Sequence, residues 1–425
     1  MCLLLWKLGY TTSNDDNQAM REAFDFGMLI APVEPTRFFA EFWEKRQLVV
    51  SRQSPGYYSD LCSLVDVDRI VSSSDLRYPA IRLVKHGPDL PTDVYTRDLR
   101  SRKFTFAGVG DTDRILLEYQ RGATILLQRL ERSWSPLAAL CSNLEQVFFH
   151  PVDANAYLTP ASSQGFGVHY DTHDVFILQL AGSKHWRLYD SPLRLPLESQ
   201  PFDQFDLNPG ALSQQVDLHA GDLIYLPRGT FHEALTSTCS SLHVTLAITP
   251  HRWADLMADA VAVVARQDER FRESVPLGST QGQDAGTLKD RFDELLRVLS
   301  ERVNLADVLD AMTDRFITER RPPLDGQLAQ LEELGRLGLR TVVARRAGLL
   351  YRLASQQHKV MLVFSQKKIA YPSEMEAALR YIATAAEFEV GSIPNLDVVQ
   401  RLLLVQRLVR EGFLIVVRQP PQDEG

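Results

Sequence analysis

The sequence has few cysteines, no long apolar run, no internal repeat and no block of basic residues. Its four cysteines are scattered without CxxC spacing, which favours reduced thiols in a cytoplasmic protein. No apolar run approaches the ~20 residues that a membrane span needs. Because the net charge is −8 and no Lys/Arg-rich block offsets it, a protein whose main role is to coat nucleic acid is also disfavoured.

The length and composition indicate a globular protein with more than one domain. A chain of 425 residues is too long for one ordinary core and predicts roughly two to three domains. Hydrophobic residues make up 45% and charged residues 24%, as in soluble globular proteins. The first segment, MCLLLWKLGY, has no basic stretch before its apolar residues and no small-residue cleavage site after them. It therefore favours a frayed start of the chain over a signal peptide.

Short apolar runs alternate with turn residues between about 80 and 249. This spacing predicts a β-sandwich or barrel, with strands in AIRLVKHGPD, VFILQLAG, HWRLYD, DLIYLPRG and SLHVTLAIT. The segment 112–146 interrupts the pattern and predicts helices on the outside of the barrel. Residues 36–46 place several aromatic side chains on one side and predict an amphipathic helix packed on the core.

Apolar residues recur with a period of 3.6 after Pro250 and predict amphipathic helices. These helices are separated by a Gly/Ser/Gln loop at 278–286 and end near Pro322 and Pro323. A final part mixes strands and helices. We therefore expect three domains, which are a barrel with an N-terminal extension over 1–250, a helical region over 251–338 and a third domain over 339–425.

The third domain is predicted to contain two helices followed by a strand hairpin. Ser373 and Glu376 form a capping-box pattern for a helix over 374–386. A second helix over 397–411 ends at Gly412, and FLIVVRQ follows as a strand. This order indicates a winged-helix-like domain. Since the second helix has nearly balanced charges and an apolar face, packing or partner docking is favoured, and direct nucleic-acid binding is not expected.

A candidate metal site begins in the segment GVHYDTHD. His169 and Asp171 are two residues apart, so on a strand their side chains share one face. His232 follows a predicted strand and the tight PRG turn, and can meet them across the interior of a small barrel. Two histidines and one carboxylate form the facial triad of non-haem Fe(II) oxygenases, which leaves positions open for a bidentate co-substrate and O₂.

Lys184 strengthens this hypothesis. It follows His169 by 15 residues, at the start of the next predicted strand. An oxygenase whose co-substrate is a dicarboxylate needs a cation inside the barrel to bind the distal carboxylate. A buried lysine without such a partner would be unfavourable.

The segments NAYLTPASSQGFGVHYDTHDVFILQLAGSKHWRLY, GDLIYLPRGTFHEA and SLHVTLAI together resemble the JmjC-type cupin 2-oxoglutarate oxygenases, specifically the ribosomal-oxygenase branch. The resemblance covers most of 80–250. It implies an α+β chain with a double-stranded β-helix barrel, followed by a helical dimerisation region and a C-terminal winged-helix-like domain. It also implies a homodimer.

The resemblance assigns roles to seven residues. It implies that Fe(II) is bound by His169, Asp171 and His232, and that Lys184 holds the distal carboxylate of 2-oxoglutarate. Asn155, Tyr157 and Thr245 match polar positions that line the co-substrate site, and no catalytic residue beyond the metal ligands is expected. The implied reaction is hydroxylation of a side chain of a protein or peptide with consumption of O₂, and an Arg or His side chain of a ribosomal protein is favoured.

Other readings of the same residues stay open. His173 is expected near the entrance or behind the ligands rather than on the metal, and His185 on the opposite face from Lys184. Arg228 is expected to brace the PRG turn, and His243 is either a core polar group or a site residue. The alternative functions are a tailoring hydroxylase of a peptide natural product or free amino acid, a lysine demethylase, and a non-catalytic cupin that binds or regulates a partner.

Overall fold

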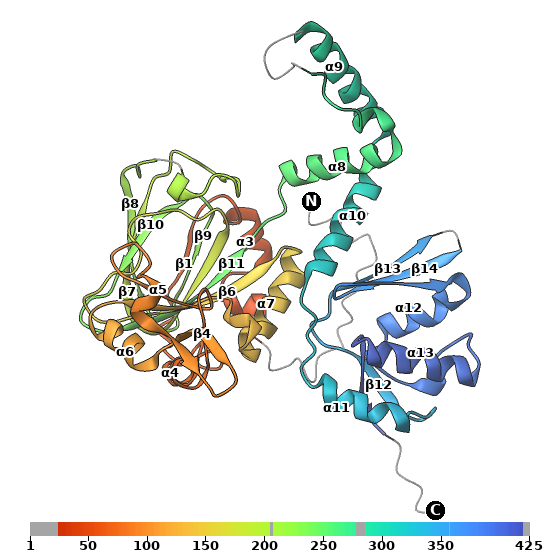
Figure 1. The fold of residues 1–425 in the computed structure, drawn as a ribbon, viewed down its shortest axis with the longest axis horizontal. Helices are drawn as coiled ribbons and strands as arrows, with labels where there is room; N and C mark the ends of the chain where they lie inside the picture. The colour runs from red at the N-terminus through yellow and green to blue at the C-terminus, as the bar shows by residue number, and fades with distance from the viewer. Residues whose placement is uncertain (1–23, 205–206, 278–284, 357, 420–425) are drawn as a thin grey trace, which may run out of the picture. The chain divides into compact units, whose positions relative to one another are not determined.

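The structure is a computed structural model that describes residues 24–204, 207–277, 285–356 and 358–419. One compact unit spans Glu22–Pro250, and His251–Gly425 belong to a second unit. Figure 1 follows the chain through both units from red to blue. The expectation for the first residues of the chain lies outside the described residues.

The first unit is built on two antiparallel sheets that share one strand. The larger sheet has the order β1 (Leu48–Val50), β9 (Leu223–Leu226), β7 (Asp174–Tyr189), β11 (Ser241–Ile248), β6 (Val152–Thr159), β5 (Thr124–Leu127) and β2 (Ile81–Val84). In the smaller sheet, β8 (Leu212–His219) and β10 (Phe231–Leu235) pair with the second half of β7. Apolar side chains from both sheets, including Ile177, Trp186, Leu188 and Leu218, form a common interior cluster. The predicted β-barrel is therefore present.

Strand β7 corrects the prediction of two separate strands. Its first half pairs with β9 and β11, and its second half pairs with β8 and β10. The change of partners occurs at Gly182, which has φ +65°, and a Cβ there would lie 1.8 Å from the carbonyl oxygen of Ser240. Because only glycine fits this backbone and close approach, the chain passes from one sheet to the other without a loop.

The segment 112–146 is helical only in part. Helices α6 (Thr112–Gln120) and α7 (Ser135–Phe148) flank β5, in which all four residues are buried. Strand β5 pairs with β2 on one side and β6 on the other. The prediction of an uninterrupted helical insertion outside the barrel is wrong at Thr124–Leu127, because this short apolar run completes the sheet.

Helices cover the outer face of the larger sheet. They are α2 (Phe26–Ile30), α3 (Pro35–Glu41), α4 (Leu64–Ser73) and α7, and their apolar side chains join those of the sheet in one core. The rings of Phe26, Phe38, Phe148 and Phe176 pack with centroids 5.0 to 6.4 Å apart. The helix predicted over 36–46 therefore packs on the core as expected, although it ends at Glu41.

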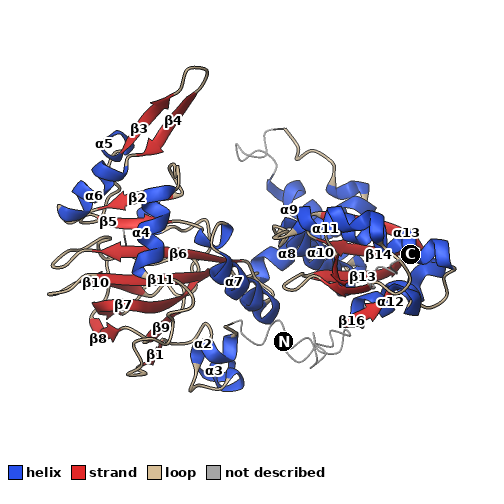
Figure 2. Cartoon of the chain, turned by 90° about the horizontal axis from the view of Figure 1, so that it is seen from below, coloured by secondary structure: helices blue, strands red, loops and turns tan. Residues whose placement is uncertain are grey.

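A separate hairpin extends from this unit. After α5 (Thr92–Tyr95), the strands β3 (Thr96–Arg100) and β4 (Thr105–Gly110) form a two-stranded sheet that pairs with no other strand of the described chain. Figure 2 shows this hairpin projecting away from the barrel strands of its unit.

The second unit begins with helices and ends with two small sheets. Its first helices are α8 (Trp253–Gln267), α9 (Ala285–Arg302), α10 (Leu305–Glu319) and α11 (Gln327–Glu332). One sheet has the order β16 (Glu387–Glu389), β12 (Val342–Arg345), β17 (Leu414–Arg418), and the other β13 (Tyr351–Gln356), β14 (Lys359–Phe364), β15 (Lys367–Pro372). Helices α12 (Glu376–Thr384) and α13 (Val398–Arg410) share a core with both sheets.

Two predictions for this unit are wrong in detail. Helix α12 has no capping box at Ser373, because the Glu376 carboxylate instead accepts a hydrogen bond from the Ser355 hydroxyl at 2.7 Å. The strand hairpin expected after α13 does not form in the described chain, since β17 pairs with the distant β12. The end of α13 before Gly412, at φ +83°, is as predicted.

Candidate metal centre

His169, Asp171 and His232 lie close together in the structure. Each offers one ligand atom, and these atoms all lie within 4.8 Å of one another. Among the described residues, no other group of three or more His, Cys, Asp or Glu side chains has this geometry. The sequence-predicted ligands are therefore brought together by the fold.

The backbone that positions these ligands differs from the expected strand. His169 and Asp171 precede β7 in an irregular segment, whereas His232 is the second residue of β10. Two backbone hydrogen bonds join His169 and His232, with N–O distances of 3.1 and 2.8 Å. The Gly229 amide donates to the Asp171 carbonyl at 2.9 Å. These hydrogen bonds hold the two ligand-bearing segments together, although the segment that carries His169 and Asp171 is not a regular strand.

The hydrogen bonds of both imidazoles are suited to a metal. Nδ1 of His169 lies 2.8 Å from the Gly167 carbonyl, and Nδ1 of His232 lies 2.9 Å from the Thr230 carbonyl. A carbonyl only accepts, so each Nδ1 carries the proton and each Nε2 presents a lone pair. The Nε2 atom of His232 lies 3.7 Å from a carboxylate oxygen of Asp171. This donor set fits a divalent transition metal.

The charge states of the ligands agree with this arrangement. Burial and the neighbouring His169 lower the pKa of His232 to about 4, so its imidazole is neutral near pH 7. Burial opposes ionisation of Asp171, but the imidazoles of His173, His169 and His232 lower its pKa overall. A neutral imidazole at His232 and a carboxylate at Asp171 are protonation states that metal binding requires.

His173 and Arg228 lie near the ligands but outside the group of three. Nε2 of His173 is 3.9 Å from the Asp171 carboxylate. The Arg228 guanidinium is buried and donates to the carboxylates of Asp174, at 2.8 Å, and Glu44. Asp174 also accepts from the Tyr225 hydroxyl at 2.7 Å. Arg228 thus braces the turn before His232 against the start of β7, as the sequence predicted.

Lys184 is buried inside the barrel on the second half of β7. Its ammonium group donates to the Thr159 hydroxyl at 3.1 Å, and no carboxylate pairs with it within the described residues. Burial lowers the pKa of Lys184 to about 7. A buried cation whose protein partner is only a hydroxyl is suited to binding an anion that enters from outside.

Asn155, Tyr157 and Thr245 share one face of the adjacent strands β6 and β11. Asn155 is the cross-strand partner of Thr245, and Tyr157 is the partner of His243. The rings of Tyr157 and His243 stack with centroids 4.7 Å apart. Burial and the Asp171 carboxylate raise the pKa of Tyr157 to about 12, so its hydroxyl stays protonated near pH 7. The Asn155 side-chain oxygen accepts from the Arg129 amide at 2.9 Å, which leaves its amino group as the donor.

The structure adds residues to this interior that the sequence analysis did not single out. Trp186 lies between the two halves of the site, with its ring centroid 5.9 Å from that of His232 and 6.0 Å from Nζ of Lys184. The indole nitrogen of Trp186 and Nδ1 of His243 are buried and have no hydrogen-bond partner among the described residues. Strand alternation from Lys184 could have identified Trp186, because residues i and i+2 share a face. Unpaired buried polar atoms of this kind fit a site for a polar ligand.

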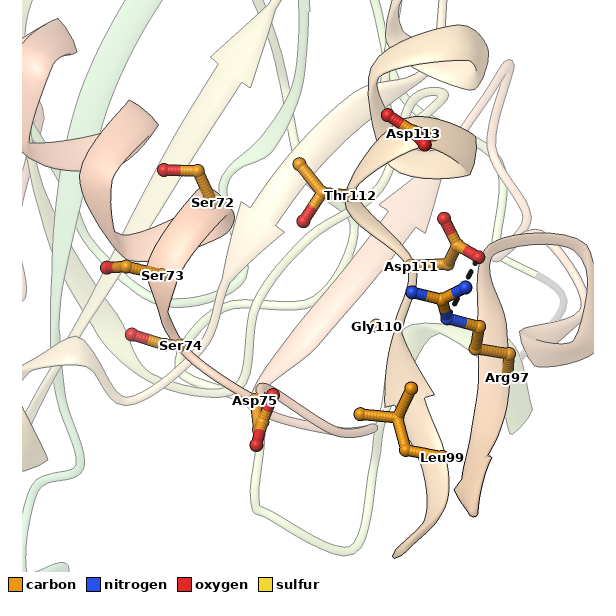
Figure 3. Close-up of a pocket in the computed structure, with 10 residues that line it drawn as sticks. All are labelled: Ser72, Ser73, Ser74, Asp75, Arg97, Leu99, Gly110, Asp111, Thr112 and Asp113. Atoms are coloured by element: carbon orange, nitrogen blue, oxygen red, sulfur yellow. Dashed lines mark ion pairs between the residues drawn. The ribbon is translucent and has the colours of Figure 1, made fainter. Parts of the chain in front are cut away.

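A hollow separate from these residues lies at the base of the β3–β4 hairpin and has a volume of about 250 Å³. Figure 3 shows its lining, in which Arg97 pairs with Asp111 at 3.3 Å and Asp75 and Asp113 lie nearby. The other polar residues there are hydroxyl-bearing side chains from the end of α4 and the start of α6. This hollow has neither a metal-ligand group nor a buried nucleophile, so the candidate catalytic site is the His–Asp–His cluster.

Comparisons with known proteins agree with this geometry. A family model described as a JmjC domain matches residues 127–256. Ribosomal oxygenase 1 of Danio rerio is 31% identical over 319 residues, which cover 70% of this chain and 57% of that protein. Ribosomal oxygenase 2 of Bos taurus is 30% identical over 349 residues, which cover 76% of this chain and 72% of that protein. The chain spans about half the length of several other curated relatives.

The fold is also similar to a solved structure. The crystal structure of Escherichia coli ribosomal oxygenase YcfD has a TM-score of 0.52 and 17% identity, covering 90% of this chain and 98% of that one. No helix of the described chain is long and apolar enough to span a membrane. By its JmjC match and its relatedness to ribosomal oxygenase 2, the chain belongs to the JmjC-domain ribosomal oxygenases.

Proposed function

We propose that this chain is an Fe(II)- and 2-oxoglutarate-dependent oxygenase that hydroxylates an Arg or His side chain of a ribosomal protein. The observation that carries the proposal is the convergence of His169, Asp171 and His232 in the same barrel interior as a buried Lys184, which has no carboxylate partner in the part of the chain that the structure describes. A facial triad leaves positions for a bidentate co-substrate and O₂, unlike a closed four-ligand zinc site.

The proposed chemistry divides between the metal and the protein. When bound, iron supplies O₂ activation coupled to oxidative decarboxylation of 2-oxoglutarate, which yields succinate and a hydroxylated side chain. Lys184 pairs with the distal carboxylate of the co-substrate. The Trp186 ring centroid lies 6.0 Å from Nζ of Lys184, and its buried indole N–H has no acceptor within the described residues. Tyr157 and Thr245 offer hydroxyls on the neighbouring strands. The apolar interior around Leu188 and Leu218 excludes water from the reacting atoms.

The substrate assignment is supported by the relatives. They are named ribosomal oxygenases, and one from Drosophila erecta, 30% identical, is named a bifunctional lysine-specific demethylase and histidyl-hydroxylase. Mass spectrometry of ribosomal proteins from cells with and without this gene tests the assignment. We expect a single Arg or His residue of one ribosomal protein to carry an added oxygen atom in cells with the gene and to lack it in cells without the gene. Identical ribosomal proteins in both strains would contradict the proposed substrate.

Two other enzymatic readings share this site, and one reading is not enzymatic. A hydroxylase of a peptide natural product or free amino acid and a lysine demethylase would use the same triad. A non-catalytic cupin would act as a binding or regulatory protein. Purified protein with Fe(II), ascorbate and labelled 2-oxoglutarate separates the last reading from the others, because substrate-uncoupled succinate formation needs a functional iron site.

We further propose three domains, over 1–250, 251–338 and 339–425, in a cytoplasmic homodimer that assembles through the second domain. Helix α8 supports dimerisation, because Trp253, Met257 and Val261 recur every four residues on one face and are 67%, 58% and 41% exposed. The winged-helix-like character of the third domain is supported by the order α12, α13, β17 alone. Its expected role is partner docking.

Replacing both Trp253 and Met257 by Asp is expected to convert the dimer to a monomer. Charges on this apolar stripe oppose its burial against a second copy, whereas the exposed positions tolerate them in the monomer. Light scattering at micromolar concentrations measures the change in mass. Val65→Asp in α4 is the matched control, since Val65 is 66% exposed in the barrel unit. A native chain that is already monomeric would contradict the dimer.

A further inference from the structure

The end of the β3–β4 hairpin carries cations and exposed aromatic residues close together in the sequence. Residues 99–106, LRSRKFTF, contain three cations and no carboxylate, although the whole chain has a net charge of −8. We call this surface the hairpin tip and define it by five residues, which are Arg100, Arg102, Lys103, Phe104 and Phe106. All five are exposed.

Two phenylalanines of the hairpin are exposed. Phe106 lies on β4 and Phe104 directly precedes that strand, and their exposed fractions are 45% and 66%. The Ser101 amide donates to the Phe104 carbonyl at 2.8 Å and closes the turn that presents them. The Arg77 guanidinium lies over the Phe106 ring, 5.9 Å from its centroid. The rings are thus held on an ordered hairpin with their surfaces open to solvent.

The cations at the tip are free to bind an anion. The side chains of Arg100, Arg102 and Lys103 form no ion pair within the described residues, whereas Arg97 at the base pairs with Asp111 at 3.3 Å. Asp98, the one acidic residue of β3, accepts from the Gly108 amide at 2.9 Å. The carboxylates of Asp75, Asp111 and Asp113 line the hollow of Figure 3 at the base, whereas residues 99–106 contain no carboxylate.

Protection of an exposed strand edge does not explain this surface. Lysine and arginine on an edge strand discourage pairing with another chain, and would account for the charges alone. Two exposed phenylalanines on the same hairpin have the opposite effect, because they add apolar area that favours association. The combination indicates a partner that has both negative charge and flat apolar faces.

We propose that the hairpin tip binds single-stranded RNA, with phosphates on the cations and bases stacked on Phe104 and Phe106. A single strand offers both a charged backbone and unpaired bases, whereas a duplex hides its base faces and an acidic peptide has none. The choice of RNA over DNA rests on the proposed ribosomal substrate. The single-stranded partner follows from the hairpin itself, and its binding requires neither metal nor turnover.

Fluorescence anisotropy of the full chain with a labelled oligouridylate tests the proposal. The double variant Arg102→Gln/Lys103→Gln is expected to weaken binding and to reduce the slope of log Kd against log salt by about 1.4. The variant Arg69→Gln/Lys359→Gln removes the same charge at exposed positions elsewhere and should leave the slope unchanged. Equal slopes for the two double variants would overturn the proposal.

The contribution of stacking is tested separately at Phe104. Phe104→Leu keeps an apolar side chain but removes the ring, and is expected to raise Kd by roughly 5- to 150-fold. Phe104→Tyr retains the ring and should bind like the native chain. No binding of oligouridylate, equal competition by duplex RNA or polyglutamate, or tighter binding of oligodeoxythymidylate would each overturn the proposal. Because this assay needs no iron, failure of catalysis does not affect its outcome.

Discussion

His232→Ala is expected to lose bound metal and to lower 2-oxoglutarate turnover by more than about 100-fold. Loss of an outer hydrogen-bond partner of a metal ligand alone costs ~10- to 100-fold in affinity or activity, and loss of a ligand should exceed that. His232 offers its Nε2 atom within 4.8 Å of the His169 and Asp171 ligand atoms. Metal content of the purified protein and succinate formation measure the two losses.

The control for His232 is its neighbour His173. Nε2 of His173 lies 3.9 Å from the Asp171 carboxylate, but this residue is not in the ligand group. His173→Ala should therefore keep the metal stoichiometry of the native chain. The backbone bonds between His169 and His232 do not involve the side chain, so His232→Ala should still fold. If the folded His232→Ala variant retained 2-oxoglutarate turnover, the assignment of His232 as a metal ligand would be wrong.

Long periodic segments could be predicted from the sequence because their patterns reflect local geometry. The helices after Pro250 appear as α8, α9 and α10, since a period of 3.6 over fifteen or more residues has one structural solution. The motif residues His169, Asp171 and His232 could be named because the residue types themselves carry the chemistry. The fold then brings them together from two separate segments.

Other features depend on contacts that no local pattern contains. Gly182 resembles a turn residue, yet β7 continues through it because the Ser240 backbone lies against the position of its missing Cβ. Strand β5 is only four residues long and gains its structure from β2 and β6 on either side. Glu376 pairs with Ser355 and Arg380 instead of capping a helix. Strand alternation from Lys184 places Trp186 on the same face, but its proximity to His232, on a different strand, could not be predicted from that pattern.

Lys184→Ala is expected to raise the 2-oxoglutarate requirement by roughly 10- to 150-fold. The substitution removes the charge-assisted contact between the Lys184 ammonium and the distal carboxylate, which contributes about 1.5–3 kcal/mol to the binding free energy. Metal binding should stay close to native, because Lys184 donates to Thr159 and is not a ligand. Titration of 2-oxoglutarate against succinate formation measures the change. An unchanged requirement would mean that the distal carboxylate is held elsewhere, and the roles of Asn155, Tyr157 and Thr245 would need reassignment.

The same contact predicts how 2-oxoglutarate affinity depends on pH. Burial lowers the pKa of Lys184 to about 7 in the free protein, and a bound carboxylate favours the charged amine and raises that pKa. Below about pH 7 the amine of Lys184 is already protonated, and the affinity for 2-oxoglutarate is at its maximum. Above about pH 7 binding must take up a proton, so the affinity falls by up to about tenfold per pH unit. Lys184→Arg should recover part of the affinity and abolish this dependence, since guanidinium stays charged. A pH dependence of the same steepness in Lys184→Arg would show that another group titrates.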